Sequence, residues 1–424
     1  MRVLLISANT ETTNMVPLPL GLNCVAVATR DAGHDVQLLD LMGSGDNYSI
    51  IQDAIQKFRP GVIGISARNI DDQHMAEPRF LLEPVRDTIA LCRTLSNATI
   101  VVGGAGFSIF PEAALRYLKA DFGICGDGEV AFTTLLQALE RGDDLSGIAG
   151  LCLPGAGVQM GCAVRARLEK LPLPDPSLWS VPADAGAEIW IPFQTRRGCP
   201  MRCSYCTTPA IEGATIRKHP VDAVVQAIAR HVAAGFNHFY FVDNTFNLPP
   251  KYARDLCTAL GSAGLGIRWR CILYPGFVDE EMVRKMAEAG CVEVSLGFES
   301  GCPAILRKFN KKYDVYQVRA ASEMLRNYGI RRIGFLLLGG PGETRESVRE
   351  SLAFADSLKL DMLKLTMGIR IYPGTALEKA AREEGLIAEG DDLLFPRFYL
   401  AEGLDGWLGP MIHEWMSDRP YCTT

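Results

Sequence analysis

The sequence has no excess of basic residues and no long apolar run. Its 43 Lys and Arg residues are outnumbered by 49 Asp and Glu residues, which gives a formal net charge of −6. Because a basic excess would be needed to attract a phosphate backbone, we expect no nucleic-acid partner. No uninterrupted apolar stretch approaches the roughly 18 residues of a membrane-spanning helix, so we expect no membrane span.

The opening residues also lack the apolar core of a signal peptide. The segment MRVLLISANT holds one Arg and only a short apolar run, whereas such a core has roughly 7–15 apolar residues. We interpret this segment as a buried first strand and expect a cytoplasmic protein.

The cysteines do not form the pattern of a disulfide framework. They are odd in number, 13 in all, and single cysteines in apolar segments of a cytosolic protein are usually small core residues. One group stands out, because Cys199, Cys203 and Cys206 follow each other with C-x3-C-x2-C spacing in RRGCPMRCSYCTTP. The scattered cysteines are Cys24, Cys92, Cys125, Cys152, Cys162, Cys257, Cys271, Cys291, Cys302 and Cys422.

The length of 424 residues predicts two domains. In residues 1–140, short apolar strands alternate with helical patterns, which indicates a parallel sheet covered on both faces, a doubly wound Rossmann-like α/β domain. Residues 141–187 lack sustained periodicity and carry several prolines, so we expect a linker there. The predicted strands are Val3–Ser7, Asp35–Leu39, Val62–Ser66, Thr99–Val102 and Asp121–Ile124.

Residues 188–385 return to the alternation of strands and helices. Six strand–helix units predict a partial (βα)6 barrel of the TIM type, with functional groups on the loops after the strands. Residues 386–424 are too short for a third domain and are expected to form a C-terminal extension. The predicted strands are Ile189–Gln194, His238–Val242, Ile267–Cys271, Val292–Gly297, Arg332–Leu338 and Met362–Met367.

The cysteine group directly follows the first strand of this second domain. Its spacing lets one tight loop present three thiolates to an inorganic cluster, and without a fourth nearby cysteine one iron of that cluster stays open. Two alternatives remain at this point, a structural zinc site and three core cysteines. Zinc normally takes four protein ligands, and the next histidine, His219, lies beyond a stretch with Pro and Gly.

This motif resembles the signature of the radical S-adenosylmethionine (SAM) superfamily, which has an aromatic residue before the third cysteine. Tyr205 occupies that position. The resemblance implies that Cys199, Cys203 and Cys206 bind a [4Fe–4S] cluster and that SAM chelates the open iron. It also implies that Tyr205 packs beside adenine and that an external donor such as flavodoxin or ferredoxin supplies electrons.

The same resemblance assigns further SAM contacts to the ends of the barrel strands. The alternatives are an Asx turn after the strand FYFVDN, capping of the next helix by Ser300, and core packing of the two residues after the last strand. The assigned residues are Asp243 and Asn244 for the amino group, Glu299 and Ser300 for the ribose or methionine end, and Ile371 and Tyr372 beside adenine.

The first domain resembles the cobalamin-binding domain that precedes the barrel in many radical SAM enzymes. In a doubly wound sheet, glycine-bearing strand ends form the ligand crevice. The Asp-x-His-x-x-Gly motif, whose His binds cobalt from below, is missing, and the corresponding loop reads SANTETTNMVPLPLG. The alternative is a domain that kept the sheet and lost the cofactor. The predicted contact residues are Ser66, Gly103, Gly104, Gly106, Gly126, Gly128 and Glu129.

Together the resemblances imply a cobalamin-dependent (class B type) radical SAM enzyme. The favoured activity is methylation of an unactivated carbon through methylcobalamin and a 5′-deoxyadenosyl radical. The alternatives are cyclisation, ring contraction or oxidation without net methylation, and a non-enzymatic cobalamin-sensing or redox-sensing module. We expect a small-molecule or peptide substrate, contacted by barrel loops and by the tail. For the tail aromatics Phe395–Tyr399, Trp407 and Trp415 we favour a packing role, with a substrate platform as the alternative.

Overall fold

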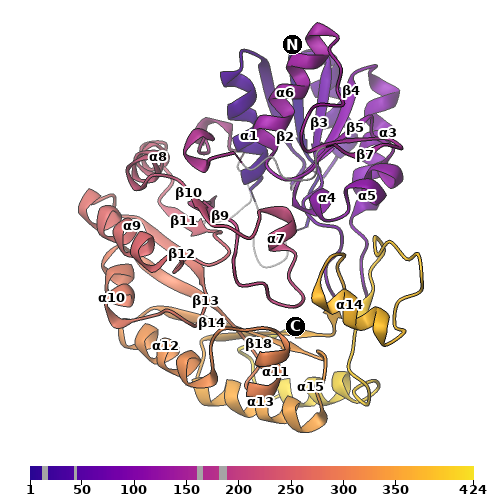
Figure 1. Ribbon diagram of the computed structural model, residues 1–424. Coiled ribbons are helices and arrows are strands. Elements are labelled where there is room, and N and C mark those ends of the chain that lie inside the picture. The colour runs from indigo at the N-terminus through magenta and orange to yellow at the C-terminus, as the bar shows by residue number, and fades with distance from the viewer. Residues whose placement is uncertain (12–17, 43–44, 160–165, 181–188) are drawn as a thin grey trace.

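The computed structural model describes residues 1–11, 18–42, 45–159, 166–180 and 189–424. Two seven-stranded sheets dominate the described part of the chain. The first sheet with its helices occupies the upper part of Figure 1, and the second curves below it. Helix α7 (Thr208–Ile211) lies between the two in that view.

The first sheet has the strand order β2-β1-β3-β4-β5-β6-β7. Strands β1 to β5 are parallel, as predicted, and β6 and β7 continue the sheet in antiparallel orientation. The bounds are β1 (Arg2–Ser7), β2 (Asp35–Asp40), β3 (Val62–Ser66), β4 (Thr99–Gly103), β5 (Phe122–Ile124), β6 (Leu151–Leu153) and β7 (Gly157–Val158).

Both faces of this sheet are buried, which confirms the doubly wound prediction. Alternate residues of a strand point to opposite faces, and in β1 the side chains of Val3 and Leu5 join one apolar cluster while Leu4 and Ile6 join another. Each cluster also contains helix residues, and these helices cover the two faces of the sheet. Their bounds are α1 (Leu20–Asp31), α2 (Asn47–Phe58), α3 (Leu82–Leu95), α4 (Ala105–Ile109), α5 (Pro111–Leu118) and α6 (Gly128–Arg141).

Three features of this half are absent from the sequence prediction. Helix α4 has five residues, and β6 and β7 have three and two, which is too short for a periodic pattern to emerge. Cys125 is disulfide-bonded. The sequence does not predict this bond, because a pairing between distant cysteines depends on the fold and not on spacing. Cys162, also predicted to be unpaired, lies outside the described residues.

The second sheet is parallel throughout and has the order β18-β15-β14-β13-β12-β11-β8. All six predicted barrel strands are present. The C-terminal extension adds the seventh, where Cys422 of β18 pairs with Leu363. The bounds are β8 (Ile191–Phe193), β11 (His238–Phe241), β12 (Arg268–Leu273), β13 (Cys291–Glu299), β14 (Arg331–Leu338), β15 (Met362–Met367) and β18 (Cys422–Thr423).

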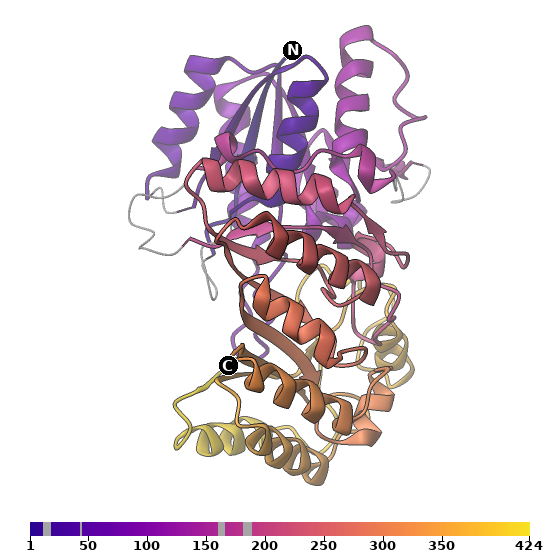
Figure 2. The same cartoon turned by 90° about the vertical axis from the view of Figure 1, so that its left-hand side faces the viewer.

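Helices cover the outer, convex face of this sheet (Figure 2). Local signals define several of their ends, as in α12, where Asp314 and Gln317 form a capping box. The helices are α8 (Val221–Ala233), α9 (Pro250–Ala263), α10 (Glu280–Glu288), α11 (Pro303–Lys308), α12 (Val315–Asn327), α13 (Arg345–Leu358), α14 (Ala376–Glu383) and α15 (Leu408–Met416). Short pieces are β9 (Arg196–Arg197), β10 (Arg217–Lys218), β16 (Ile369–Arg370), β17 (Phe398–Tyr399), η1 (Leu168–Lys170) and η2 (Pro176–Leu178).

Candidate functional site

The three predicted cluster ligands lie on one loop between β9 and α7. Gly198 precedes this loop with φ of 95°, and a Cβ there would come within 2.3 Å of the Thr215 carbonyl oxygen. The next residue, Cys199, donates its backbone N–H to the Gly213 carbonyl at 2.9 Å. The β9–β10 hairpin therefore fixes where the cysteine loop begins, and only glycine fits before it.

The three thiols lie close enough to influence each other electrostatically. The pKa of Cys199 is raised to about 11, chiefly by burial, and the neighbouring Cys206 and Cys203 contribute to the rise. Within the described residues, no group of three or more His, Cys, Asp or Glu side chains is arranged to hold a single metal ion. In a four-iron cluster each of the three cysteines binds a different iron.

Tyr205 is held at this loop by aromatic packing. Its ring meets Phe309 edge to face, with centroids 5.4 Å apart, and the Lys311 ammonium lies 5.2 Å from the ring centroid. This position beside the cysteines is the place where adenine stacking is predicted.

Asp243 and Asn244 follow β11 and have different surroundings. The Asp243 side chain is fully buried, and its carboxylate accepts the Thr195 backbone N–H at 2.7 Å and pairs with Arg196 at 3.2 Å. Its oxygens are therefore occupied by the start of the barrel. The Asn244 amide instead accepts a hydrogen bond at 3.1 Å from Thr208, the hydroxyl next to Cys206.

Glu299 and Ser300 end β13 in unusual geometry. Glu299 has a φ of 60° beside a register shift in the strand pairing, and its carboxylate lies 3.2 Å from Lys311 Nζ. Ser300 is fully buried, and its hydroxyl accepts the Cys302 backbone N–H at 3.0 Å and contacts the Ser351 hydroxyl at 2.9 Å. Glu299 thus lies at the cysteine loop, while Ser300 supports the turn into α11.

Ile371 and Tyr372 follow the last barrel strand on the opposite side of the cysteine loop. Ile371 is buried, and Tyr372 is close enough to Cys206 for that thiol to contribute to the raised pKa of its phenol, after burial and Asp71. The Arg370 guanidinium lies 5.0 Å from the Tyr372 ring centroid. The structure therefore places Tyr372 near the cysteine loop, whereas Ile371 belongs to the apolar core.

A cavity of about 310 Å³ opens at the carboxyl ends of the first sheet. Most of its wall is apolar, and the second domain closes one side with residues such as Pro192 and Val242. Of the predicted cobalamin contacts, all except Gly106 line it. They are Ser66, Gly103, Gly104, Gly126, Gly128 and Glu129.

Two glycines at the mouth of this cavity occupy positions where a side chain would clash with the backbone. Gly104 has a φ of 107°, and a Cβ there would come within 2.6 Å of the Ala67 carbonyl oxygen. Gly106 lies two residues further along the chain and donates its backbone N–H to the carbonyls of Ala67 and Arg68. An apolar cavity with a glycine-bearing mouth at the strand ends fits the nucleotide tail of cobalamin. Of the loop that replaces the histidine motif, residues 12–17 lie outside the described residues.

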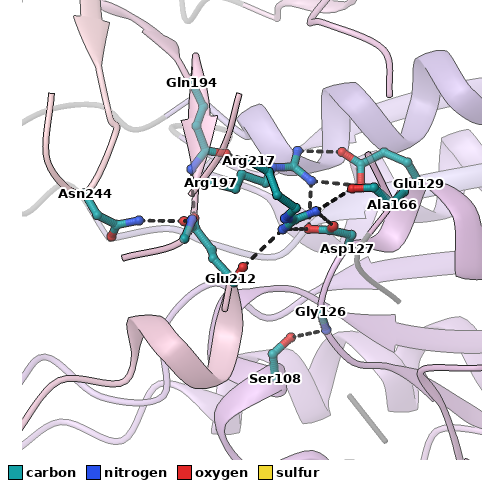
Figure 3. A network of polar contacts seen from close by, with 11 residues as sticks. Ser108, Gly126, Asp127, Glu129, Ala166, Gln194, Arg197, Glu212, Arg217 and Asn244 are labelled. Atoms are coloured by element: carbon teal, nitrogen blue, oxygen red, sulfur yellow. Dashed lines mark hydrogen bonds and ion pairs between the residues drawn. The ribbon is translucent and has the colours of Figure 1, made fainter. Parts of the chain in front are cut away.

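A polar network joins this cavity to the cysteine loop (Figure 3). Arg197 donates to Glu129 at 2.6 Å and to Asp127 at 3.0 Å, and its Nε donates to Gln194 at 3.1 Å. Gln194 donates in turn to Glu212 at 2.7 Å. The network thus starts at the turn after β5 and crosses into the barrel domain.

Glu212 connects this network to residues of the predicted SAM site. Its carboxylate accepts the Gly198 backbone N–H at 2.9 Å and the Asn244 amide N–H at 2.5 Å. Arg217 adds a second ion pair to Asp127. Gly198 directly precedes the first cysteine, and Glu212 lines the cavity. One hydrogen bond, from Gly198 to Glu212, therefore links the wall of the predicted cobalamin site to the start of the cysteine loop.

The sequence analysis missed several residues of this arrangement. Asp127, Arg197 and Glu212 all line the cavity, as does Arg68, whose pKa is lowered by burial. Asp127 and Arg197 lie within two positions of predicted site residues, which is a usable signal. Arg68 has the same signal, because it lies two positions after Ser66, whereas Glu212 has none and reaches the cavity only through the docking of the two domains.

Comparison with known proteins extends this picture. The family model described as Radical SAM superfamily matches residues 194–355, and the one described as B12 binding domain matches residues 6–136. An uncharacterized methyltransferase of Pyrococcus horikoshii is 29% identical over 91% of this chain and 84% of its own length. Tryptophan 2-C-methyltransferase of Streptomyces laurentii is 24% identical over 86% of this chain and 72% of its own length.

A solved structure with the same arrangement is the radical SAM methyltransferase TsrM of Kitasatospora setae, with cobalamin and a [4Fe–4S] cluster bound. It superposes with a TM-score of 0.81 at 25% identity, over 90% of this chain and 75% of that one. The two family segments follow each other in the predicted order and together cover more than half of the chain. The chain therefore belongs to the radical SAM enzymes that carry an N-terminal cobalamin-binding domain, and its cofactors are a [4Fe–4S] cluster, SAM and cobalamin.

Proposed function

We propose that this enzyme transfers a methyl group to an unactivated carbon of a small molecule. The observation that carries the proposal is the wall shared by the two cofactor sites, in which Arg197 and Glu212 both line the cobalamin cavity. Arg197 lies two residues before Cys199, and Glu212 accepts the backbone N–H of Gly198. The methyltransferases of Pyrococcus horikoshii and Streptomyces laurentii support it. Among the described residues, none of the helices has the length and apolar character needed to cross a membrane.

When bound, the cofactors supply one-electron cleavage of SAM and a methyl carrier. The chain supplies positions and exclusion of water. Cys199, Cys203 and Cys206 hold the cluster, and Tyr205, Asn244, Glu299 and Tyr372 surround the space beside it. Ser66, Gly103, Gly104 and the turn from Gly126 to Glu129 form the cobalamin cavity.

For the substrate we propose a second cavity, of about 590 Å³, on the other side of the domain interface. The loop after β3, strand β15 and the C-terminal extension line it, among them Gln73, Lys364, Thr366 and Asp405. Its size and mixed polarity suit a small molecule with polar groups. Filling it with Thr366→Trp should abolish product formation while SAM cleavage without substrate persists, and full activity of that variant would remove this cavity from consideration.

In this proposal the tail contributes apolar, non-aromatic residues to the cavity. Leu400, Leu404 and Pro410 line this cavity, whereas the aromatic tail residues pack elsewhere. Phe395 stacks on Phe80 with centroids 4.6 Å apart, and Trp407 lies under the Arg345 guanidinium at 5.2 Å.

For the electron donor we propose the exposed basic rim beside the cysteine loop, which we define as Arg202, Arg307, Lys308 and Lys312. All four side chains are exposed. The rim is tied to the loop, because Asn310 donates to the Arg202 carbonyl at 2.7 Å. Such a rim complements an acidic flavodoxin or ferredoxin and would steer its approach.

The methyl-transfer proposal is tested by anaerobic reconstitution with a low-potential reductant and SAM carrying a trideuterated methyl group. Incubation with small-molecule extracts should give S-adenosylhomocysteine, 5′-deoxyadenosine and a product heavier by the labelled methyl. Replacement of Cys199, Cys203 and Cys206 by Ala should abolish iron binding and all products. Turnover with 5′-deoxyadenosine but no labelled product would contradict the proposal.

That last outcome would favour radical chemistry without net methylation. Relatives of this kind exist, since the anaerobic magnesium-protoporphyrin IX monomethyl ester cyclase of Rubrivivax gelatinosus is 23% identical over 78% of this chain. A mass change in the product other than the labelled methyl would identify such an activity.

A further inference from the structure

Lys311 is a buried lysine at the cysteine loop to which neither the sequence motifs nor the proposed function assigns a role. It lies in the segment between α11 and α12, and its side chain is 5% exposed. The ammonium lies 5.2 Å from the ring centroid of Tyr205 and 6.0 Å from that of Tyr313. Its charge is close enough to the Cys203 thiol to oppose the rise in the pKa of that thiol that burial causes.

One carboxylate holds this ammonium in place. Glu299 Oε1 lies 3.2 Å from Lys311 Nζ, and it reaches that point because Glu299 adopts a φ of 60° after the register shift in β13. A Cβ on Gly297 would come within 3.0 Å of the same carboxylate oxygen. Left-handed backbone at a residue with a side chain is uncommon and needs support from its surroundings, so the fold constrains this ion pair closely.

Burial strengthens the electrostatic effect of the Lys311 ammonium on the groups around it. A lysine in water is screened, whereas a charge in a partly dehydrated site acts strongly on its neighbours. Around Lys311 the neighbours are two phenols, one carboxylate and the sulfur of a cluster ligand. The potential of an iron–sulfur cluster depends on the net charge nearby and on hydrogen bonds to its sulfurs.

We propose that Lys311 is a positioning residue that raises the reduction potential of the [4Fe–4S] cluster through its buried positive charge, with Glu299 limiting the effect. The ammonium favours the reduced cluster because reduction adds a negative charge beside it. Lys311 thereby makes reduction by a biological donor easier.

The test is the midpoint potential of the cluster in the full-length enzyme reconstituted with cluster and cobalamin. It is measured without SAM, by redox titration followed by electron paramagnetic resonance, so that contacts to SAM play no part. For Lys311→Met we expect at least a tenfold lower ratio of reduced to oxidised cluster at a fixed potential, or about 59 mV for one electron. An exposed lysine outside the basic rim gives the control, and Lys251→Met should leave the potential unchanged.

Two further variants separate charge from shape. Lys311→Arg keeps the charge and should stay near the wild-type potential, whereas Glu299→Gln removes the opposing charge and should shift the potential upward. The double variant Lys311→Met, Glu299→Gln should lie between the single ones.

An unchanged potential in Lys311→Met with full iron content overturns the proposal. If that variant does not retain its cluster, Glu299→Gln decides, since an unchanged or lower potential there overturns the proposal as well. An equal downward shift in Lys311→Arg would show that packing, and not charge, sets the potential, which is also a contradiction.

Discussion

Arg197 donates to the Glu129 carboxylate at 2.6 Å and thereby joins the barrel domain to the cobalamin domain. Arg197 lies two residues before the first cluster ligand, and Glu129 lies in the first turn of α6, where the helix N-terminus also favours a carboxylate. Both side chains are almost fully enclosed. This pair therefore fixes the two proposed cofactor sites relative to each other at their shared wall.

Removing the cation should destabilise this wall. Arg197→Met leaves the buried Glu129 without its partner, which costs roughly 3–5 kcal/mol in comparable cases. We expect a lower melting temperature and weaker cobalamin retention, measured by thermal unfolding and by the absorption spectrum after gel filtration. The control Arg167→Met breaks the exposed pair with Glu169 and should cost at most about 1 kcal/mol.

A double variant distinguishes lost contact from stranded charge. Adding Glu129→Gln to Arg197→Met removes the unpaired carboxylate and should recover part of the stability. If the double variant is less stable than Arg197→Met alone, the cost does not come from the uncompensated charge.

Gly104→Ala should damage the cobalamin cavity. The added Cβ would meet the Ala67 carbonyl oxygen at 2.6 Å, in backbone that already has a φ of 107°. Gly33→Ala is a matched control, because Gly33 has a φ of 88° with no atom within 4 Å of the added Cβ. We expect the control to lose about 1–2 kcal/mol from backbone strain alone and to bind cobalamin normally. Equal cobalamin binding by both variants would contradict the assignment of this cavity.

The stability of the enzyme should depend on pH through Glu343. Burial raises the pKa of its carboxyl to about 7, although the backbone N–H groups of Gly339 and Gly340 oppose the shift. The folded state therefore binds this proton more tightly than the unfolded state. That contribution, on the order of 3 kcal/mol, is fully present below the ordinary pKa near 4.5 and is lost as the pH rises to 7.

Glu343→Gln should remove this dependence. We expect the melting temperature of the wild type to fall relative to that of the variant between pH 5 and about pH 7, measured by circular dichroism. The exposed Glu389→Gln should follow the wild-type profile. Parallel profiles for wild type and Glu343→Gln would show that Glu343 does not titrate in this range.

Reversing charges on the basic rim should impair only the biological donor. In Arg202→Glu, Lys308→Glu the rate of cluster reduction by flavodoxin or ferredoxin should fall several-fold at low salt, and the difference should shrink at high salt. Reduction by dithionite should be unchanged. The same double reversal at Lys57 and Lys379, two other exposed lysines, should have no effect on either rate.

The bounds of individual strands and helices show how much of the fold the sequence predicts. The strands Val62–Ser66 and Met362–Met367 have the predicted bounds, because their apolar pattern and end signals are local. Elements of two to five residues, such as β18 and α4, were not predicted. They exist because neighbouring chain segments offer hydrogen bonds and apolar cover, which no short window of sequence records.

The sequence by itself determined the two domains, the parallel sheets and the cysteine loop, because periodicity and ligand spacing are properties of contiguous residues. Only the tertiary structure decided which polar residues take part. It enclosed the Asp243 carboxylate against Thr195 and Arg196, it turned Glu299 onto Lys311, and it joined Arg197 to Glu129. These pairings connect residues far apart in the chain, and their energies depend on burial, which exists only once both domains have folded and docked.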